Sequence, residues 1–343
     1  MKKKVTLIGS LPNPIGGISS YCKRLLTSDL SFHYAVMVDL YSGLDKYNIP
    51  IKVFRPKFYN KIYKAIWIFF IISFKTTNVL HFNFSGVKGS LIALICLKRR
   101  KSWVLTLHNG SLKLPSGIIG FLCSYALGRF DKILVISQKQ YDFMQRMGLS
   151  HKCIFVDSYI PLKNELNLSI KNKTRVTRFI ENYDKCLLGS GYGKKIYCFD
   201  YLVDFSRDNP SVGLIIVLYG EFEKDVINFL KESALQLDNL ILLDSLEESE
   251  FNSLLQHIDI YVRPNSVDSF GIACADAIMF GKLVVASDVC KRFEGVNTFK
   301  TNDYDDFVRV LNSALLSTHS KLTELDPELL IQEKISVYNK AYK

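Results

Sequence analysis

Short apolar runs rich in β-branched residues alternate along this chain with longer stretches of helical periodicity. This rhythm is typical of βαβ units built on a parallel sheet. The first half predicts six strands: Lys4–Ile8, Tyr34–Leu40, Val79–Asn83, Trp103–Leu107, Lys132–Ile136 and Lys152–Val156. The second half predicts five more: Lys185–Leu188, Gly213–Leu218, Leu240–Leu243, Ile258–Val262 and Leu283–Ala286. The pattern predicts an α/β protein with two similar layered domains.

The two series of strands meet near Pro161 and the polar stretch Lys163–Arg178, which we expect to join the domains. A chain of 343 residues also exceeds what one hydrophobic core usually serves. We therefore expect an N-terminal domain over residues 1–165 and a C-terminal domain over residues 166–326. The last segment, Pro327–Tyr342, predicts an amphipathic helix, because proline and an acidic residue both suit its first turn.

Open parallel sheets bind ligands in the loops that leave the carboxyl ends of their strands. Four segments occupy such places, namely Gly9–Gly17, His108–Gly110, Gly189–Lys195 and Asn265–Gly271. These four segments are therefore the candidate ligand-binding loops.

The most informative stretch is Tyr261–Asp288, which follows a predicted strand, passes a loop and enters a predicted helix at about Phe270. Amides at the start of that helix would point at a phosphate, with Asp268 before them and Asp276 two turns along. The alternative is that Asp268 only caps the helix and that Asp276 is a solvated helix residue.

This stretch resembles the signature of the family 4 retaining glycosyltransferases, in which Phe-Gly follows one acid and a second acid stands eight positions after the first. Arg263 with Pro264, the run Gly281–Asp288 and the later Arg292 also fit. The family usually has two glutamates, whereas this chain has two aspartates. The resemblance implies that Asp268 positions the donor sugar and that Asp276 contacts the ribose. It also implies donor binding by four residues between them: Ser269, Phe270, Gly271 and Ile272.

Two N-terminal segments are similar to others of the family. Gly16 and Gly17 end a glycine loop after the first strand, where backbone amides can approach a diphosphate; an ordinary turn is the alternative. His108 ends a Thr-Leu-His segment like the one that faces the donor sugar in the family. A lone histidine is more often structural, but beside the motif around Asp268 we favour a catalytic role.

The segment Gly189–Lys195 fits neither a P-loop nor a dinucleotide fingerprint, because its glycine spacing is wrong and no hydroxyl follows Gly-Lys. The family usually has an arginine and a Lys-Gly pair here for the donor diphosphate. This chain has Ser190 and Tyr197-Cys198 in those places. The positive charge that holds the donor diphosphate is therefore expected from Lys194, Lys195 or Arg263.

The resemblance implies the GT-B fold: two Rossmann-like domains facing a central cleft, with a helix over residues 327–343 that packs back toward the N-terminal domain. It implies a retaining hexosyltransferase that needs no metal or other cofactor and takes a UDP- or GDP-linked sugar. Retention in the family is usually explained by front-face attack, in which the leaving diphosphate accepts the acceptor's proton. The chain resembles enzymes of bacterial polysaccharide biosynthesis, whose acceptors are often lipid-linked saccharides. A nucleotide-sugar epimerase of this fold and a catalytically degenerate GT-B binding protein are the alternatives.

The net charge of +11 is divided unevenly along the chain. Residues 1–165 hold 24 Lys+Arg against 7 Asp+Glu, or +17, and the remainder carries −6, which restores +11. A field of this size attracts polyanions such as nucleic acid, phospholipid headgroups or phosphorylated substrates. We find no recognition helix, RNP or zinc signature, so we expect no nucleic acid partner.

An anionic membrane surface is the expected partner of the basic domain. Basic and aromatic residues alternate before an apolar run, Ala65–Phe74, which is too short to span a bilayer and is expected to be mostly core. The residues expected to face the membrane are Lys57, Lys61, Lys64, Arg99 and Arg100. Eight scattered cysteines without metal or redox spacing indicate reduced thiols. We expect a cytoplasmic protein associated peripherally with the inner face of the plasma membrane.

Overall fold

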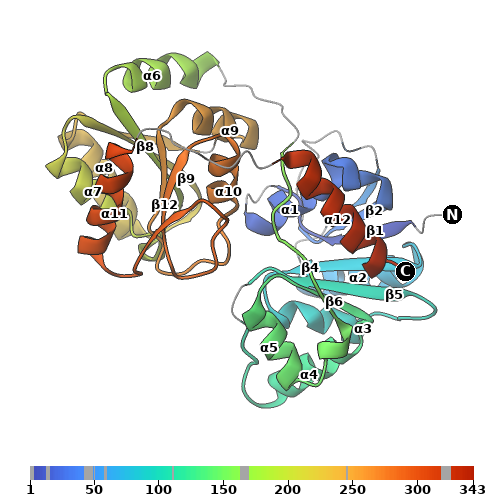
Figure 1. Cartoon of the computed structure of the whole chain (residues 1–343). Helices are drawn as coiled ribbons and strands as arrows, with labels where there is room; N and C mark the ends of the chain where they lie inside the picture. Colours follow the sequence, from blue (N-terminus) through green and yellow to red (C-terminus); the bar gives the residue numbers. More distant parts are fainter. Residues whose placement is uncertain are drawn as a thin grey trace. The chain divides into compact units, whose positions relative to one another are not determined.

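The computed structural model describes residues 4–12, 16–41, 49, 51–57, 60–109, 112–162, 170–244, 246–317 and 326–343. The chain forms two compact units (Figure 1). Unit 1 comprises residues 1–163 and 326–343, and unit 2 comprises residues 164–325. Each unit has its own parallel sheet with helices on both faces.

Unit 1 contains a seven-stranded parallel sheet in the order β3-β2-β1-β4-β5-β6-β7. The strands are β1 (Val5–Gly9), β2 (Tyr34–Asp39), β3 (Lys52–Phe54), β4 (Val79–Phe84), β5 (Ser102–Leu107), β6 (Lys132–Val135) and β7 (Cys153–Phe155). The order reverses between β1 and β4, where crossover connections change direction. The β-branched runs predicted all of these strands except β3.

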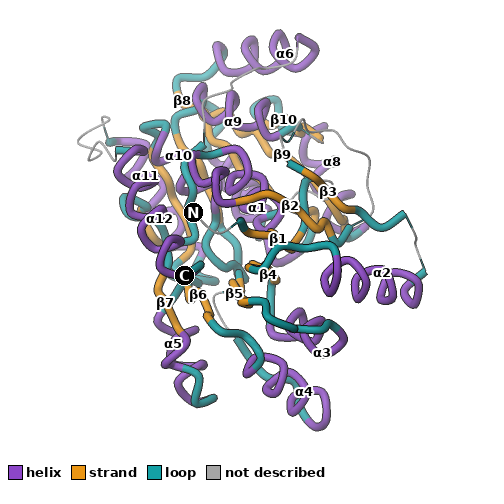
Figure 2. Tube along the Cα trace, turned by 90° about the vertical axis from the view of Figure 1, so that its right-hand side faces the viewer, coloured by secondary structure: helices purple, strands orange, loops and turns teal. Residues whose placement is uncertain are grey.

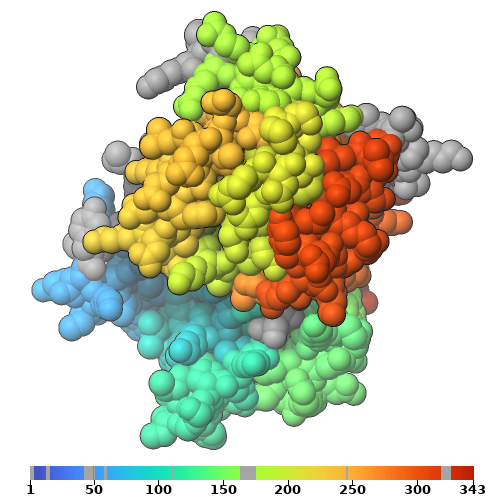
Figure 3. Space-filling view, turned by 90° about the vertical axis from the view of Figure 1, so that its left-hand side faces the viewer, coloured from blue at the N-terminus to red at the C-terminus, as the bar shows by residue number. Residues whose placement is uncertain are grey.

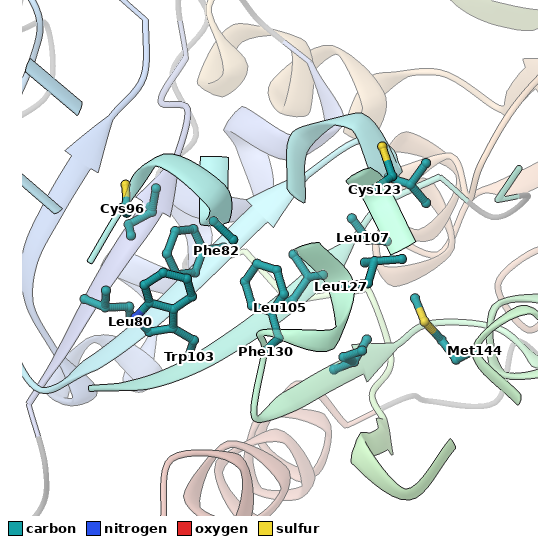
Figure 4. Packing of buried hydrophobic residues seen from close by; sticks show 14 of the residues in the cluster. Leu80, Phe82, Cys96, Trp103, Leu105, Leu107, Cys123, Leu127, Phe130 and Met144 are labelled. Atoms are coloured by element: carbon teal, nitrogen blue, oxygen red, sulfur yellow. The ribbon is translucent and has the colours of Figure 1, made fainter. Parts of the chain in front are cut away.

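Helices cover both faces of this sheet and close two hydrophobic clusters. On one face lie α2 (Lys61–Phe74), α3 (Ile92–Ile95), α4 (Gly117–Gly128) and α5 (Gln138–Arg146). Figure 4 shows the core beneath them, where Trp103 packs against Phe82 and Phe130 with ring centroids 5.3 and 5.9 Å away. The other face is covered by α1 (Gly17–Thr27) and α12 (Pro327–Ala341).

The C-terminal helix α12 returns to unit 1, as the resemblance implied. The Tyr342 hydroxyl lies 2.8 Å from His81 Nδ1 and 2.7 Å from the Tyr34 hydroxyl, and all three groups are buried. Tyr338 forms a second hydroxyl pair with Tyr21. Buried hydrogen bonds therefore fix α12 in one register on the sheet.

Tyr342→Phe is expected to destabilise unit 1 by about 1–3 kcal/mol, because it leaves two buried polar groups without their partner. Both tryptophans, Trp67 and Trp103, lie in unit 1, so tryptophan fluorescence during urea denaturation reports its unfolding. The control is Tyr125→Phe, since the Tyr125 side chain is 63% exposed. Equal midpoints for the two variants would show that the buried network does not hold α12.

Unit 2 contains a six-stranded parallel sheet in the order β10-β9-β8-β11-β12-β13. The strands are β8 (Lys185–Gly193), β9 (Val212–Phe222), β10 (Leu240–Asp244), β11 (Ile260–Arg263), β12 (Leu283–Ser287) and β13 (Asn297–Phe299). One face carries α7 (Phe199–Asp208), α8 (Lys224–Gln236) and α11 (Tyr304–Leu316). Figure 3 shows this side, with the yellow-green surface of α7 between the red surface of α11 and the yellow surface of α8. The other face carries α6 (Ile170–Glu181), α9 (Glu248–His257) and α10 (Ile272–Met279).

The expected polar connection is wrong over much of its length, because residues from Ile170 onward form α6. Val176 and Phe179 of this helix are buried in the core of unit 2. Apolar residues at helical spacing within a charged segment are enough to attach it to a sheet.

Candidate active site

The order of strands reverses between β8 and β11 in unit 2, and between β1 and β4 in unit 1. Loops diverge at such points and leave room for a ligand at the carboxyl ends of the strands. The predicted site residues fall into two groups, one at each of these edges, and each group is described within its own unit.

Asp268 is the centre of the group in unit 2. Arg263, the last residue of β11, donates to it from Nε and Nη2 at 2.6 and 3.0 Å. Arg292 donates from Nη1 to the same carboxylate at 2.6 Å, and the Ser269 amide does so at 2.9 Å. Both oxygens of Asp268 thus accept hydrogen bonds from the protein itself.

Arg292 is fixed in turn by the carboxyl end of β12. Its Nε donates to the Ser287 carbonyl at 2.8 Å and its Nη2 contacts the Ser287 hydroxyl at 3.0 Å. That hydroxyl donates to the Asn265 carbonyl at 2.6 Å. Two neighbouring strands, β11 and β12, therefore present two guanidinium groups held at defined positions.

The three charged side chains are nearly removed from solvent, with 10% of Arg263, 7% of Asp268 and 3% of Arg292 exposed. Burial alone would raise the pKa of Asp268, but the charges and hydrogen bonds of the two arginines outweigh it and lower that pKa below its usual range. The cluster therefore carries two positive charges and one negative charge. The net positive charge at a sheet edge attracts anions, and guanidinium groups suit phosphate oxygens.

Gly271 allows this cluster to close. It adopts φ 78°, in the left-handed region that favours glycine. A Cβ atom there would lie 2.9 Å from Arg292 Nη1 and 3.1 Å from Arg263 Nε. The Phe-Gly step of the motif is therefore required by both the backbone and the arginines.

Helix α10 begins at Ile272, two residues after the position predicted from the sequence. The difference arises because the left-handed Gly271 precedes the first helical turn. Phe270 lies before the helix, and its carbonyl accepts from Arg292 Nη1 at 3.4 Å. Asp276 lies within α10 and is buried, so its interpretation as a solvated residue is wrong. Its ribose contact stays a prediction.

The expected loop Gly189–Lys195 is mostly strand, because β8 continues through Gly193. A Cβ atom on Gly191 would lie 2.0 Å from Tyr197 Cδ1, so this glycine makes room for the tyrosine ring. Arg263 Cζ lies 5.9 Å from the centroid of the same ring. Tyr197 stands where the family usually has lysine, and here it packs beneath the arginine cluster.

Ser190 is the other departure from the family. Its hydroxyl lies 2.8 Å from the Tyr261 hydroxyl, and this hydrogen bond is buried. Lys194 forms an ion pair with Glu221 at 2.6 Å, which raises the pKa of the lysine. Lys195 is exposed, and its amide donates to Glu223 at 3.2 Å. Neither lysine is hydrogen-bonded to Asp268, so the arginines are the better source of positive charge for an anion here.

In unit 1, Gly16 precedes α1 and Gly17 is its first residue. The rest of the glycine loop, residues 13–15, lies outside the described residues. A Cβ atom on Gly17 would meet nothing within 4 Å. The space that a side chain at position 17 would occupy is therefore open at the start of α1.

His108 follows β5 and lies near the start of α1. Its Nε2 is 3.0 Å from Asn83 Oδ1, and its ring packs edge-on against Tyr21 with centroids 4.6 Å apart. Asn83 Nδ2 donates to the His81 carbonyl, so Asn83 presents an oxygen and Nε2 carries the proton. Burial lowers the pKa of His108 to about 4. The imidazole is therefore neutral at pH 7, with the lone pair on Nδ1.

Gln140 is a site residue that the sequence did not reveal. It is buried on α5, and its amide donates to the carbonyls of Leu107 and Asn109 at 2.7 and 2.8 Å. Its oxygen accepts from the Ile136 amide at 2.9 Å. It holds the turn that carries His108, but one glutamine in an amphipathic helix gives no sequence signal of this kind.

The predicted membrane residues lie on and around α2 in unit 1. Lys57, Lys61, Arg99 and Arg100 are exposed, and Lys64 lies 5.3 Å from the centroid of the Tyr41 ring. Phe58 and Tyr59, two of the aromatic residues that alternate with the lysines in the sequence, lie outside the described residues. The interpretation of Ala65–Phe74 as mostly core is wrong, because only Ile71, Ile72 and Ser73 of α2 are buried.

Within the described ranges, no group of three or more His, Cys, Asp or Glu side chains is placed to hold a metal ion. None of the eight cysteines forms a disulfide bond, and five of them are buried.

Comparisons with known proteins bear on the fold of the chain. Residues 200–324 match the family model described as "Glycosyl transferases group 1". A search of curated proteins gives no match. Anabaena HepE in complex with UDP and glucose has a TM-score of 0.75 at 14% identity, with 98% of this chain and 100% of that chain covered. Thermosynechococcus elongatus sucrose-phosphate synthase has a TM-score of 0.70 at 12% identity, with 99% of both chains covered.

The lipopolysaccharide outer core galactosyltransferase WaaB has a TM-score of 0.61 at 15% identity, with 99% of this chain and 98% of that chain covered. At these identities the likeness establishes the fold and nothing finer. The chain therefore has the GT-B fold of two Rossmann-like domains, and residues 200–324 carry the glycosyltransferase group 1 match.

Proposed function

We propose that this protein is a retaining glycosyltransferase that transfers a hexosyl group from a nucleotide-sugar to a lipid-linked saccharide during polysaccharide biosynthesis. The observation that carries the proposal is the Arg263–Asp268–Arg292 cluster. It lies at the strand-order reversal of unit 2, inside the segment that resembles the family 4 signature. The family match over residues 200–324 includes the whole cluster.

In the proposed reaction, Arg263 and Arg292 bind the donor diphosphate, and Asp268 holds both arginines in position. The bond between the anomeric carbon and the diphosphate oxygen breaks as the acceptor oxygen attacks from the same face, and the acceptor's proton passes to the leaving diphosphate. Two preorganised guanidinium groups stabilise the charge that develops on that leaving group. Neutral His108 contributes a hydrogen-bond acceptor, Nδ1, toward the donor sugar.

The proposed donors are UDP- and GDP-sugars, with UDP favoured by the bound UDP and UDP-glucose in the HepE structures. The proposed acceptor is lipid-linked, because the basic excess is confined to the N-terminal domain and anionic headgroups attract such a surface. The enzyme would then work at the cytoplasmic side of a membrane.

Thermal-shift measurements with UDP-, GDP- and ADP-sugars test donor binding, because a ligand well above its dissociation constant raises the melting temperature. Arg263→Gln serves as the binding-deficient comparison. Stabilisation of the wild type by one nucleotide class, largely lost in the variant, is expected. No shift with any nucleotide-sugar, or equal shifts in both proteins, would contradict the assignment of the diphosphate to this cluster.

Activity is expected to survive EDTA, since the proposal assigns the leaving diphosphate to two arginines and the start of α10. Initial rates would be compared with EDTA, with added Mg²⁺ and with added Mn²⁺. Loss of activity in EDTA that either metal restores would show that a cation, rather than the arginines alone, neutralises the leaving group.

A further inference from the structure

The segment from Lys46 to Phe130 contains no Asp or Glu, although it holds fourteen Lys and Arg residues. These fourteen charges account for most of the +17 carried by residues 1–165. The segment includes α2, α3 and α4, which cover one face of the sheet in unit 1. The positive field of the protein is therefore concentrated around these three helices.

Helix α2 exposes apolar side chains along its whole length. Ile62, Ile66, Phe70 and Phe74 recur every four residues and thus share one face, and they are 71%, 58%, 50% and 45% exposed. The opposite side contributes Ile71 and Ile72 to the core. A helix that is apolar all round is normally buried all round. Here the described residues cover only one side of α2.

Helix α4 likewise has one side in the core and exposed apolar side chains on the other. Cys123 and Leu127 are buried beneath it, while Ile118, Phe121 and Tyr125 on its outer side are 78%, 73% and 63% exposed. The sequence of this helix gives no sign of an exposed side, because a run of twelve apolar and small residues looks like an ordinary core helix.

The exposed stripe of α2 continues into the segment that follows α3, and α3 in turn packs against α4. Leu97, which follows α3, is exposed, and its amide donates to Ser73 Oγ of α2 at 3.1 Å. Arg99 Cζ lies 5.3 Å from the centroid of the Phe74 ring. Figure 2 shows α2, α3 and α4 in succession along one edge of unit 1.

We call this surface the α2–α4 face. It holds twelve of the twenty large apolar side chains that are exposed among the described residues: Ile62, Tyr63, Ile66, Phe70, Phe74, Ile95, Leu97, Ile118, Ile119, Phe121, Leu122 and Tyr125.

We infer that the α2–α4 face inserts into the interfacial region of an anionic lipid bilayer. Its apolar side chains enter the boundary between headgroups and acyl chains, and Lys57, Lys61, Arg99 and Arg100 at its rim contact anionic headgroups. Within the described residues, no helix is long and apolar enough to cross a membrane, so the face would lie in the plane of the surface. The face lies within the segment from Lys46 to Phe130, which lacks acids, and this favours anionic headgroups as its partner.

This inference rests on the proposed function in one respect, because a lipid-linked acceptor gives insertion its purpose. Insertion of the α2–α4 face would keep the protein on the membrane when salt screens the charges. Attachment by charge alone would be lost at high ionic strength.

Trp67 of α2 offers a native probe of insertion. The full-length protein would be mixed with vesicles of phosphatidylcholine and phosphatidylglycerol in which bromine atoms on the acyl chains quench nearby tryptophan. We expect quenching that persists in high salt once the protein is bound. Trp67→Phe should remove it, because the remaining Trp103 is fully buried.

The insertion variant is Phe70→Ser/Phe121→Ser, and its matched control is Leu235→Ser/Leu316→Ser. The control residues are 88% and 86% exposed on α8 and α11 of unit 2. We expect the insertion variant to partition into the vesicles about tenfold or more weakly than the wild type, because each aromatic side chain withdrawn from water contributes. The control should partition like the wild type. The variant Lys57/Lys61/Lys64→Glu should weaken binding at low salt.

Absence of quenching in the wild type, or equal partitioning of the insertion variant and its control, would overturn the inference. A dimer that ignores vesicles and dissociates in the insertion variant would instead assign the face to a second copy of the chain. Nucleotide-sugar binding in solution, measured on the same variants, separates failure of this inference from failure of the proposed function.

Discussion

Replacing Asp268 by alanine is expected to remove most of the transferase activity and to lower the free energy of unfolding by about 3–5 kcal/mol. The alanine would leave Arg263 and Arg292 buried without their common carboxylate, and an uncompensated buried charge is strongly destabilising. Turnover should fall at least 100-fold, because both arginines that we propose to hold the leaving diphosphate would lose their positions. Steady-state kinetics and calorimetric unfolding measure the two effects.

The matched control is Asp204→Ala, which removes the carboxylate of an exposed ion pair with Arg207. Exposed pairs of this kind contribute only about 0–1 kcal/mol. Near-native turnover and stability in Asp268→Ala would remove this residue from the site.

The effect of Asp268 on stability also depends on pH. Its pKa is lower in the folded state than in the unfolded chain, so its contribution is complete above about pH 5 and declines as the pH falls below the unfolded value of about 3.9. Asp268→Asn should flatten this acid limb of the stability curve.

Replacing His108 by alanine is expected to lower kcat about 100-fold or more, with a smaller effect on the nucleotide-binding affinity. The group that is lost is a neutral hydrogen-bond acceptor, because burial lowers the pKa of His108 to about 4. The pH profile of kcat for the wild type should therefore show no ionisation of this histidine between pH 5.5 and 8, where an unperturbed imidazole of pKa about 6.5 would titrate.

His151→Ala is the control, since His151 is exposed and lies in the short helix before β7, away from the loop after β5. Unchanged kcat in both variants, or a bell-shaped profile in the wild type with a His108-dependent limb near pH 6.5, would contradict the proposed role.

Alternation of apolar and helical segments predicted the fold well, because strands buried on both faces leave continuous β-branched runs. It failed for β3 and β13, which have three residues each and lie at the edges of their sheets. Segments this short contain too few positions to show a period, and β7, which is equally short, was predicted as part of the longer run Lys152–Val156. The charged helix α6 was missed for another reason, since its polar positions outnumber the residues that attach it to unit 2.

The candidate site was predicted in part. The motif identified Asp268 and Gly271, but spacing along the chain could not show that Arg292, which lies beyond the next strand, binds the same carboxylate oxygen as Arg263. The position of Gly189–Gly193 after a predicted strand suggested a ligand-binding loop, whereas β8 continues through these residues and Gly191 makes room for the Tyr197 ring. A glycine signals close approach of some group, and only the fold shows which group approaches.

Glycosyl transfer itself is tested most directly by following the donor's anomeric carbon with NMR while the enzyme, a UDP- or GDP-sugar and lipid-linked saccharides react on anionic vesicles. We expect release of nucleoside diphosphate that depends on the acceptor, and a new glycosidic bond with the anomeric configuration of the donor. Interconversion of the donor without acceptor would identify an epimerase. Binding without any turnover would identify a degenerate binding protein, and either result would contradict the proposed transfer.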